Sequence, residues 1–177
     1  MPKASLDALV RQAIRPIPDH PKPGIVFQDI TPVLQDAPLF RQVIEGLAGP
    51  FRSERISHVV GIEARGFILG GPVAVELKAG FIPARKPGKL PWKTRRHEYA
   101  LEYGTDCLET HEDAFAEGAR VLVVDDVLAT GGTALAAASL VRLLGAELIG
   151  WTFLLELEFL HGRERLTGAP VATIARL

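Results

Sequence analysis

Apolar and polar positions alternate along this chain with two periods, one typical of helices and one typical of buried strands. Near the N-terminus, Leu6, Leu9, Val10 and Ala13 follow the spacing of one helix face. Helices are expected at residues 5–14, 38–48, 67–78, 133–144 and 159–166. Short apolar runs predict buried strands at residues 58–62, 80–84, 120–124, 148–155 and 171–174. From residue 38 onward, the helix and strand signals therefore alternate.

This alternation predicts an α/β fold with a mainly parallel, twisted sheet flanked by helices on both faces. Ligands of such sheets bind beyond the carboxyl ends of the strands. Two stretches depart from the pattern. Four prolines between residues 16 and 23 force an ordered loop. Residues 86–106 are polar, basic and interrupted by Pro and Gly, which predicts a mobile functional loop.

The composition narrows the class of protein. The chain has 177 residues, of which 47% are hydrophobic and 23% charged, and this suits one compact domain over residues 1–177. A net charge of −1 argues against a nucleic acid as partner. No apolar run reaches the roughly 18 residues that a membrane helix needs, so no membrane is expected either. The single Cys107 cannot form an internal disulfide, and the N-terminus lacks a signal-peptide pattern, so a cytoplasmic location is expected.

The segment VLVVDDVLATGGTALAA, residues 121–137, is the most informative part of the chain. An apolar strand is expected to end in Asp125 and Asp126, a turn with two glycines follows, and Thr133 is expected to open a helix. A helix N-terminus offers unpaired N–H groups and partial positive charge, and glycines let the backbone approach an anion closely. The segment therefore predicts a phosphate cradle, although the lysine of the usual P-loop is absent.

Two carboxylates beside a phosphate site require a ligand that also carries hydrogen-bond donors or a metal. A ribose 5-phosphate meets this need, because its diol can donate charge-assisted hydrogen bonds to the carboxylates. The alternative is a plain strand–turn–helix in which an aspartate only caps the helix. The whole segment resembles the phosphoribosyl pyrophosphate (PRPP) motif of the type I phosphoribosyltransferases, and its ATGGT is similar to the adenine-specific branch. The resemblance implies that the 5-phosphate and ribose of PRPP bind to Asp125, Asp126, Ala129, Thr130, Gly131, Gly132 and Thr133.

Two further segments resemble the family's pyrophosphate site. GIEARGF, residues 61–67, is similar to the pyrophosphate loop, which implies a contact from Arg65 and a cis peptide at Glu63–Ala64. ARKPGKLP, residues 84–91, is similar to the Arg-Lys-x-Gly-Lys-Leu-Pro segment of the family. This second likeness implies pyrophosphate contacts from Arg85, Lys86 and Lys89. Without the resemblance, the first segment would be a tight turn and the second a run of solvated charge.

The base is expected to lie between two other segments. PKPGIVFQDITPVL, residues 21–34, resembles the part of the family that covers the purine, so residues 1–34 would contribute to a small hood over the base. Val26, Phe27 and Gln28 match the positions that line the purine, and Leu157 would pack on its second face. The alternative for Phe27 and Leu157 is an ordinary place in the core. Gln28 departs from the arginine of most relatives.

The segment YALEYG, residues 99–104, resembles the end of the family's catalytic loop. Glu102 matches the carboxylate that transfers a proton, and Tyr103 matches the tyrosine beside it. Without the resemblance, Glu102 would more often be a solvated strand residue.

The resemblance spans nearly the whole chain and implies a transferase of purine salvage, which joins adenine to the phosphoribosyl group of PRPP and releases AMP and pyrophosphate. Magnesium is expected as cofactor, bound mainly through PRPP, with no dedicated protein metal site. A homodimer is also implied, since in related enzymes some of the cations reach the neighbouring subunit's site.

Two other functions fit parts of the sequence. A PRPP-sensing regulator of the same fold would keep the segment 121–137 but would usually carry a nucleic-acid-binding domain, for which 177 residues leave no room. A phosphoribosyltransferase for another base is opposed by ATGGT and by the base-covering segment.

Overall fold

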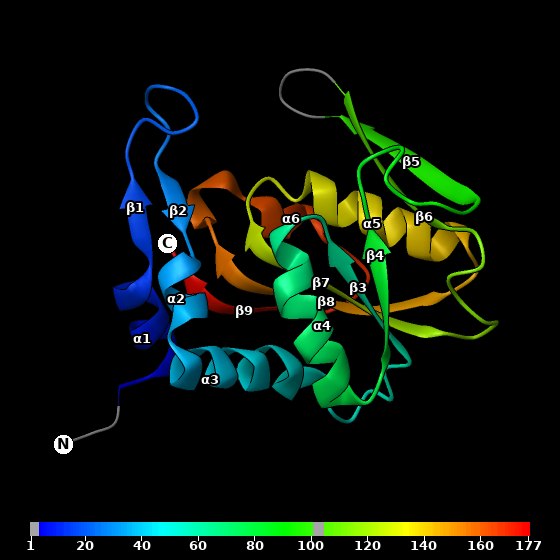
Figure 1. Cartoon of the computed structure of the whole chain (residues 1–177), viewed down its shortest axis with the longest axis horizontal. Coiled ribbons are helices and arrows are strands. Elements are labelled where there is room, and N and C mark those ends of the chain that lie inside the picture. The colour runs from blue at the N-terminus through cyan, green and yellow to red at the C-terminus, as the bar shows by residue number, and fades with distance from the viewer. Residues whose placement is uncertain (1–3, 101–104) are drawn as a thin grey trace.

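A parallel sheet of five strands forms the centre of the molecule (Figure 1). The computed structural model describes residues 4–100 and 105–177 of the chain. The strand order is β4–β3–β7–β8–β9, and every neighbouring pair is parallel. The strands are β3 (His58–Ile62), β4 (Gly80–Ala84), β7 (Arg120–Leu128), β8 (Glu147–Glu156) and β9 (Val171–Arg176). The predicted fold class, a mainly parallel sheet flanked by helices, is confirmed.

Helices cover both faces of this sheet. Buried side chains of α1, α3 and α4 pack on one face, and those of α5 pack on the other. The helices are α1 (Leu6–Ala13), α2 (Thr31–Gln35), α3 (Ala37–Ala48), α4 (Arg65–Leu77), α5 (Gly132–Leu143) and α6 (Gly162–Arg165). Two short 3₁₀ helices are η1 (Gly49–Phe51) and η2 (Glu158–Leu160).

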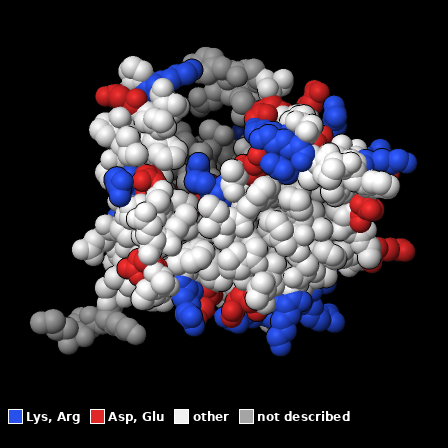
Figure 2. Space-filling view, viewed as in Figure 1, with Lys and Arg blue, Asp and Glu red and all other residues white. Residues whose placement is uncertain are grey.

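Two small antiparallel sheets flank the central one. Strands β1 (Arg15–Ile17) and β2 (Phe27–Asp29) pair at one end of the molecule. Strands β5 (Thr94–Ala100) and β6 (Thr105–His111) pair as a hairpin that lies beside α5 (Figure 1). The surface is hollowed between these two parts (Figure 2). Across the described ranges, no helix combines the length and apolar character needed to cross a membrane.

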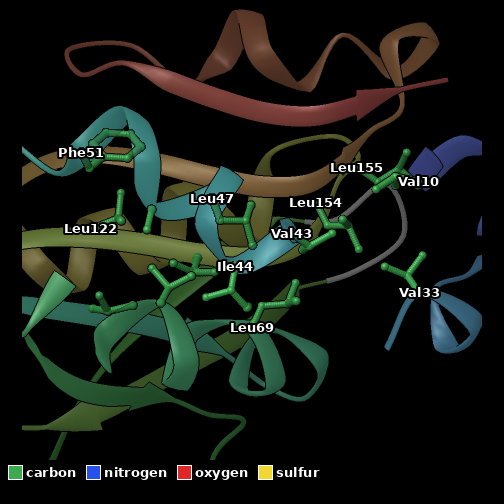
Figure 3. Close-up of a cluster of buried hydrophobic side chains, with 14 of the residues drawn as sticks. Val10, Val33, Val43, Ile44, Leu47, Phe51, Leu69, Leu122, Leu154 and Leu155 are labelled. Carbon is green, nitrogen blue, oxygen red and sulfur yellow. The ribbon is translucent and has the colours of Figure 1, made fainter. Parts of the chain in front are cut away.

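The core follows the two-residue alternation of the central strands. In β7, Leu122 and Val124 join the cluster under α3 and α4, whereas Val121 and Val123 join the cluster under α5. Figure 3 shows the first cluster, in which Leu122 lies among residues of α3 and α4. Burying a leucine or valine stabilises a fold by about 1.5–3 kcal/mol, so this packing on both faces fixes the sheet that carries the functional site.

The hairpin corrects one expectation. The sequence predicted a loop over residues 86–106, but strand β5 and the start of β6 lie within it. The apolar alternation of a strand is absent there because β5 is mostly polar, and the side chains of its residues 94–99 are exposed or half-buried rather than part of the buried core. A strand without a buried apolar face gives no hydrophobic signal.

Strand β7 corrects a second expectation, since it continues to Leu128 instead of ending at Val124. Its pairing with β3 ends at Gly61–Val124, while its pairing with β8 continues to Leu128–Glu156. The last residues of β7 therefore extend past β3 and are paired on one side only. This leaves room beside them at the carboxyl edge of the sheet.

Candidate active site

Strands β3 and β7 lie side by side, but the chain leaves them in opposite directions along the sheet. From β3 it passes through α4 to β4, and from β7 it passes through α5 to β8. Ligands of open α/β sheets bind in the crevice at such a switch point, outside the carboxyl ends of the strands. A cavity of about 370 Å³ lies there. The predicted site residues that line it are Val26, Phe27, Gln28, Arg65, Lys86, Asp125, Asp126, Ala129, Thr133 and Leu157.

The base side of this cleft is formed by β2 and by the residue that follows β8. Phe27 and Gln28 lie on β2 and are half-buried. Leu157 is held by a hydrogen bond from its N–H to the carbonyl of Leu128, at 2.9 Å. The guanidinium of Arg65 lies 5.3 Å from the centre of the Phe27 ring. An aromatic face, an aliphatic side chain and backbone groups thus line one cavity, which suits a planar heterocycle.

Residues 129–133, named here the glycine loop, follow β7 and include the first two residues of α5. Gly131 has φ +78°, a left-handed conformation that favours glycine. A second, smaller cavity of about 60 Å³ is lined by the whole loop and by Asp125. Its lining includes all five predicted loop residues, Ala129, Thr130, Gly131, Gly132 and Thr133. This places a small cavity at the N-terminus of a 12-residue helix, where backbone N–H groups favour an anion.

The two adjacent carboxylates lie on the extended end of β7. Asp126 is buried and accepts a hydrogen bond from Nε of Arg65, while Asp125 is half-buried and lines both cavities. The N–H of Asp126 donates to Oδ1 of Asp125 at 2.9 Å. Burial and the neighbouring charge of Asp126 raise the pKa of Asp125 well above its usual value. The pair therefore presents carboxyl oxygens to a hydroxyl-rich ligand next to the glycine loop.

The predicted cations are held by acidic partners. Lys89 Nζ lies 2.5 Å and Arg85 Nη2 lies 3.3 Å from Oε1 of Glu63, and the N–H of Lys86 donates to Oε2 at 3.0 Å. Burial acts to raise the pKa of Glu63, but these hydrogen bonds outweigh it and lower the pKa to about 2. Lys86 Nζ pairs with Asp106. Arg65 and Lys86 line the cleft, whereas Arg85 and Lys89 lie outside its lining.

The predicted cis peptide at Glu63–Ala64 is present. Arg65 is the first residue of α4, and Glu63, Ala64 and Arg65 all line the cleft. This places the loop between β3 and α4 at the cleft, opposite the end of β7.

Three acidic residues that organise the cations were not predicted from the sequence. Glu63 lies within the segment that resembles the pyrophosphate loop, so its position was the only signal for it. Asp106 and Glu109 come from β6, where nothing in the pattern set them apart. Glu109 is buried and accepts hydrogen bonds from the N–H of Gly88 at 2.8 Å and from Thr94 Oγ1 at 3.2 Å.

Glu102 and Tyr103 lie outside the described residues, so their predicted roles stay predictions. Within residues 4–100 and 105–177, no group of three or more His, Cys, Asp or Glu side chains is arranged to hold a metal ion. Carboxyl oxygens at the cleft come from the Asp125–Asp126 pair and from Glu63.

Comparison with known proteins gives a consistent result. The model of the phosphoribosyl transferase domain family matches residues 33–164. An adenine phosphoribosyltransferase of Myxococcus xanthus is 58% identical over 170 residues, which cover 96% of this chain and 92% of that protein. An adenine phosphoribosyltransferase of Acidothermus cellulolyticus is 52% identical over 177 residues, and the match covers 100% of both chains.

Solved structures of adenine phosphoribosyltransferases are also similar to this chain. The adenine phosphoribosyltransferase of Rhodothermus marinus has a TM-score of 0.93 at 54% identity, covering 97% of this chain and 98% of that one. The enzyme of Saccharomyces cerevisiae, complexed with adenine and an imino-altritol bisphosphate, has a TM-score of 0.89 at 39% identity, covering 96% of this chain and 98% of that one.

Proposed function

The chain belongs to the phosphoribosyl transferase domain family, and within it to the adenine phosphoribosyltransferases, and from that premise we propose how its cleft works. The reaction transfers the 5-phosphoribosyl group of PRPP to adenine and yields AMP and pyrophosphate, a step of purine salvage. The enzyme is thus a glycosyltransferase of the pentosyltransferase kind.

The proposal rests on one observation: the cleft and the glycine-loop cavity share the lining residues Asp125, Ala129 and Thr133. Surroundings that suit a base, a ribose and a phosphate therefore adjoin one another. Adenine lies between Phe27 and Leu157, with backbone groups at Val26 and Gln28 facing its edge. The ribose diol donates hydrogen bonds to Asp125 and Asp126. The 5-phosphate occupies the glycine loop, where Ala129, Thr130, Gly131, Gly132 and Thr133 offer N–H and hydroxyl donors.

The cations stabilise the leaving group. As N9 of adenine bonds to C1 of the ribose, the bond from C1 to pyrophosphate breaks, and negative charge collects on the pyrophosphate. Arg65 and Lys86 line the cleft and are placed to contact it directly. Arg85 and Lys89 pair with Glu63 in the structure and would turn to the pyrophosphate when it is bound, which adds positive charge beside the leaving group.

Magnesium is proposed as the cofactor. Its ligands would be mainly PRPP oxygens and water, since this ion prefers substrate phosphates to a protein cage. Asp125 and Asp126 line the cleft, and their carboxyl oxygens are of the kind that this ion accepts beside a bound PRPP. When bound, the ion would supply positive charge to the leaving pyrophosphate.

Glu102 is proposed, on the resemblance of its segment, to accept the proton that adenine loses from N9. General base help is typically worth ~100- to 10,000-fold, so Glu102→Gln should slow single-turnover AMP formation within that range. A single-turnover rate within threefold of the unaltered enzyme at saturating PRPP would remove Glu102 from the chemistry.

The arrangement of PRPP is tested by calorimetry. Thr133→Val removes one hydroxyl at the glycine loop and should weaken PRPP binding about tenfold in the presence of magnesium. Thr167→Val, at an exposed position away from the cleft, is the matched control and should bind normally. Chelating the magnesium should weaken PRPP binding by the unaltered enzyme. Unchanged binding by Thr133→Val would contradict the place given to the 5-phosphate.

A homodimer in the cytoplasm is proposed as the working form. The outer side of α4 leaves apolar side chains exposed, with Ile68 at 45% and Val75 at 79% of full exposure. Apolar side chains grouped on one face favour a protein partner, and the resemblance makes a second copy the expected one. The free thiol of Cys107 suits a reducing compartment.

A further inference from the structure

Residues 161–166, named here the bracing segment, follow η2 and contact the glycine loop. Gly162 is buried against it. A Cβ atom placed at Gly162 would collide with the carbonyl oxygen of Ala129 and would lie 2.9 Å from the backbone nitrogen of Gly131. A Cβ atom at Gly131 would in turn lie 2.8 Å from the carbonyl oxygen of Gly162. Each backbone therefore fills the space that a side chain of the other would need.

This contact is between two main chains, so it leaves no flexible side chain that could yield. Protein interiors transmit such displacements because they are close-packed. The position of Gly162 therefore sets the position of the glycine loop, and not only its stability.

Arg165 makes a second contact from the same short helix. Its Nη1 donates a hydrogen bond to the carbonyl oxygen of Thr130 at 2.9 Å. The peptide that joins Thr130 to Gly131 is planar and trans, so its N–H points opposite to its carbonyl. By holding the carbonyl of Thr130, Arg165 orients the N–H of Gly131 away from itself.

The bracing segment is anchored to the central sheet at the position between these two residues. Arg163 donates to both carboxylate oxygens of Glu156, at 2.8 Å and 2.5 Å, and to the carbonyl of Val171 at 2.8 Å. Glu156 is 4% exposed, and the hydrogen bonds from Arg163 lower its pKa. A bidentate pair between a half-buried arginine and a buried carboxylate has a defined geometry. The segment therefore connects the rigid end of β8 to the glycine loop.

We propose that Gly162 and Arg165 are positioning residues of the transfer reaction, which hold the glycine loop in the shape that accepts the 5-phosphate of PRPP. Neither residue lines the cleft or the glycine-loop cavity, so both act through the backbone of residues 129–131. The inference rests on the proposed function, because it assigns the 5-phosphate to the glycine loop.

The test compares ligands that do and do not carry the 5-phosphate. Arg165→Met keeps an unbranched, flexible stem but loses the donor, and it should weaken PRPP and AMP binding about three- to tenfold. Arg165→Lys keeps a charged donor and should recover most of that loss. Gly162→Ala should weaken both ligands more than tenfold, because the loop must move. Pyrophosphate binding should stay within twofold in all three variants.

Glu164→Gln is the control, since the described contact of this neighbouring side chain is to His161 alone. It should bind PRPP, AMP and pyrophosphate normally. Binding is measured by calorimetry, and the melting temperature of each variant is recorded so that an unfolded sample is not counted.

The results distinguish failure of the proposed function from failure of the positioning role alone. If the unaltered enzyme does not bind PRPP, the proposed function fails. If it binds PRPP but Arg165→Met and Gly162→Ala bind it equally well, only the positioning role is wrong. Equal loss of PRPP and pyrophosphate binding would also overturn the positioning role, because it would indicate general damage to the fold. Should Gly162→Ala not fold, the comparison of Arg165→Met with Arg165→Lys decides.

Discussion

Glu63 is the residue on which the cations beside the cleft converge. Its carboxylate receives Lys89, Arg85 and the N–H of Lys86, and its side chain is 11% exposed. Without these partners, burial would disfavour its charge. The same contacts keep two cations next to the cleft before any pyrophosphate arrives. Glu63 is thus a structural counter-charge for the cations proposed to bind pyrophosphate.

The pH dependence of stability follows from this carboxylate. Its pKa in the folded state, about 2, is below the ordinary 4.5. A lowered pKa stabilises the folded state above pH 4.5, and this contribution is lost as the pH falls toward 2. Glu63→Gln should reduce the free energy of unfolding near neutral pH by about 1–2 kcal/mol, since the partner cations are part-exposed.

Urea unfolding at pH values from neutral to about 3 measures how the free energy of unfolding depends on pH. The difference between the unaltered enzyme and Glu63→Gln should shrink below pH 4.5, where the unfolded chain takes up the proton. Glu117→Gln, on the exposed surface, should differ little at any pH. A difference for Glu63→Gln that is the same at every pH would contradict the account of its pKa.

The hairpin of β5 and β6 organises the segment that follows β4. Glu109 on β6 accepts from the N–H of Gly88 and from Thr94 on β5, and its backbone pairs with Arg85. Residues 85–89, which carry the predicted cations, are therefore tied to the hairpin by a buried carboxylate. Figure 2 shows Lys and Arg side chains gathered beside the hollow.

Removing this carboxylate should have two effects. Glu109→Ala leaves the N–H of Gly88 without its partner, which should lower the free energy of unfolding by about 1–3 kcal/mol. It should also raise the KM for pyrophosphate in the reverse reaction, because residues 85–89 lose their anchor. Glu112→Ala, at an exposed position near the end of β6, should change neither value. Normal stability and normal KM for Glu109→Ala would show that the hairpin does not hold this segment.

Elements with an apolar pattern could be predicted from the sequence, and the others could not. Strands β3 and β4 were predicted to the residue, because both faces of the central sheet are covered and these two strands carry no charged residue after their first position. Strands β1 and β2 lie in a proline-rich stretch and are exposed or half-buried, so no run of apolar residues marks them. The length of β7 depended on its partner β8, which local sequence does not encode.

In the candidate site too, residues within one recognisable segment could be predicted, and residues that depend on distant contacts could not. The glycine loop and Arg65 stand out in single segments, because their chemistry lies in consecutive residues. Gly162 could not be predicted as part of the site, since its role depends on contact with a loop about 30 positions earlier in the sequence.

At the scale of the whole molecule, the central sheet places the cleft on one edge and leaves α4 with an apolar outer side. If a second copy covers this side, a charge there should separate the copies. Val75→Glu should therefore convert a dimer into a monomer in light scattering coupled to gel filtration. Leu143→Glu, which adds the same charge at an exposed apolar position on α5, should remain dimeric. Identical masses for both variants would contradict the place given to the interface.

Under the proposed function, the cleft recognises adenine while the glycine loop holds the 5-phosphate of PRPP. Adenine offers a 6-amino donor and an N1 acceptor, and hypoxanthine reverses both, so backbone groups near Val26 and Gln28 would face the wrong partner. Each unpaired polar group costs about 1–3 kcal/mol. The most direct measurement is PRPP consumption with adenine, hypoxanthine, guanine and orotate in parallel. Adenine should exceed every other base at least tenfold in kcat/KM, and equal turnover of adenine and hypoxanthine would contradict the account.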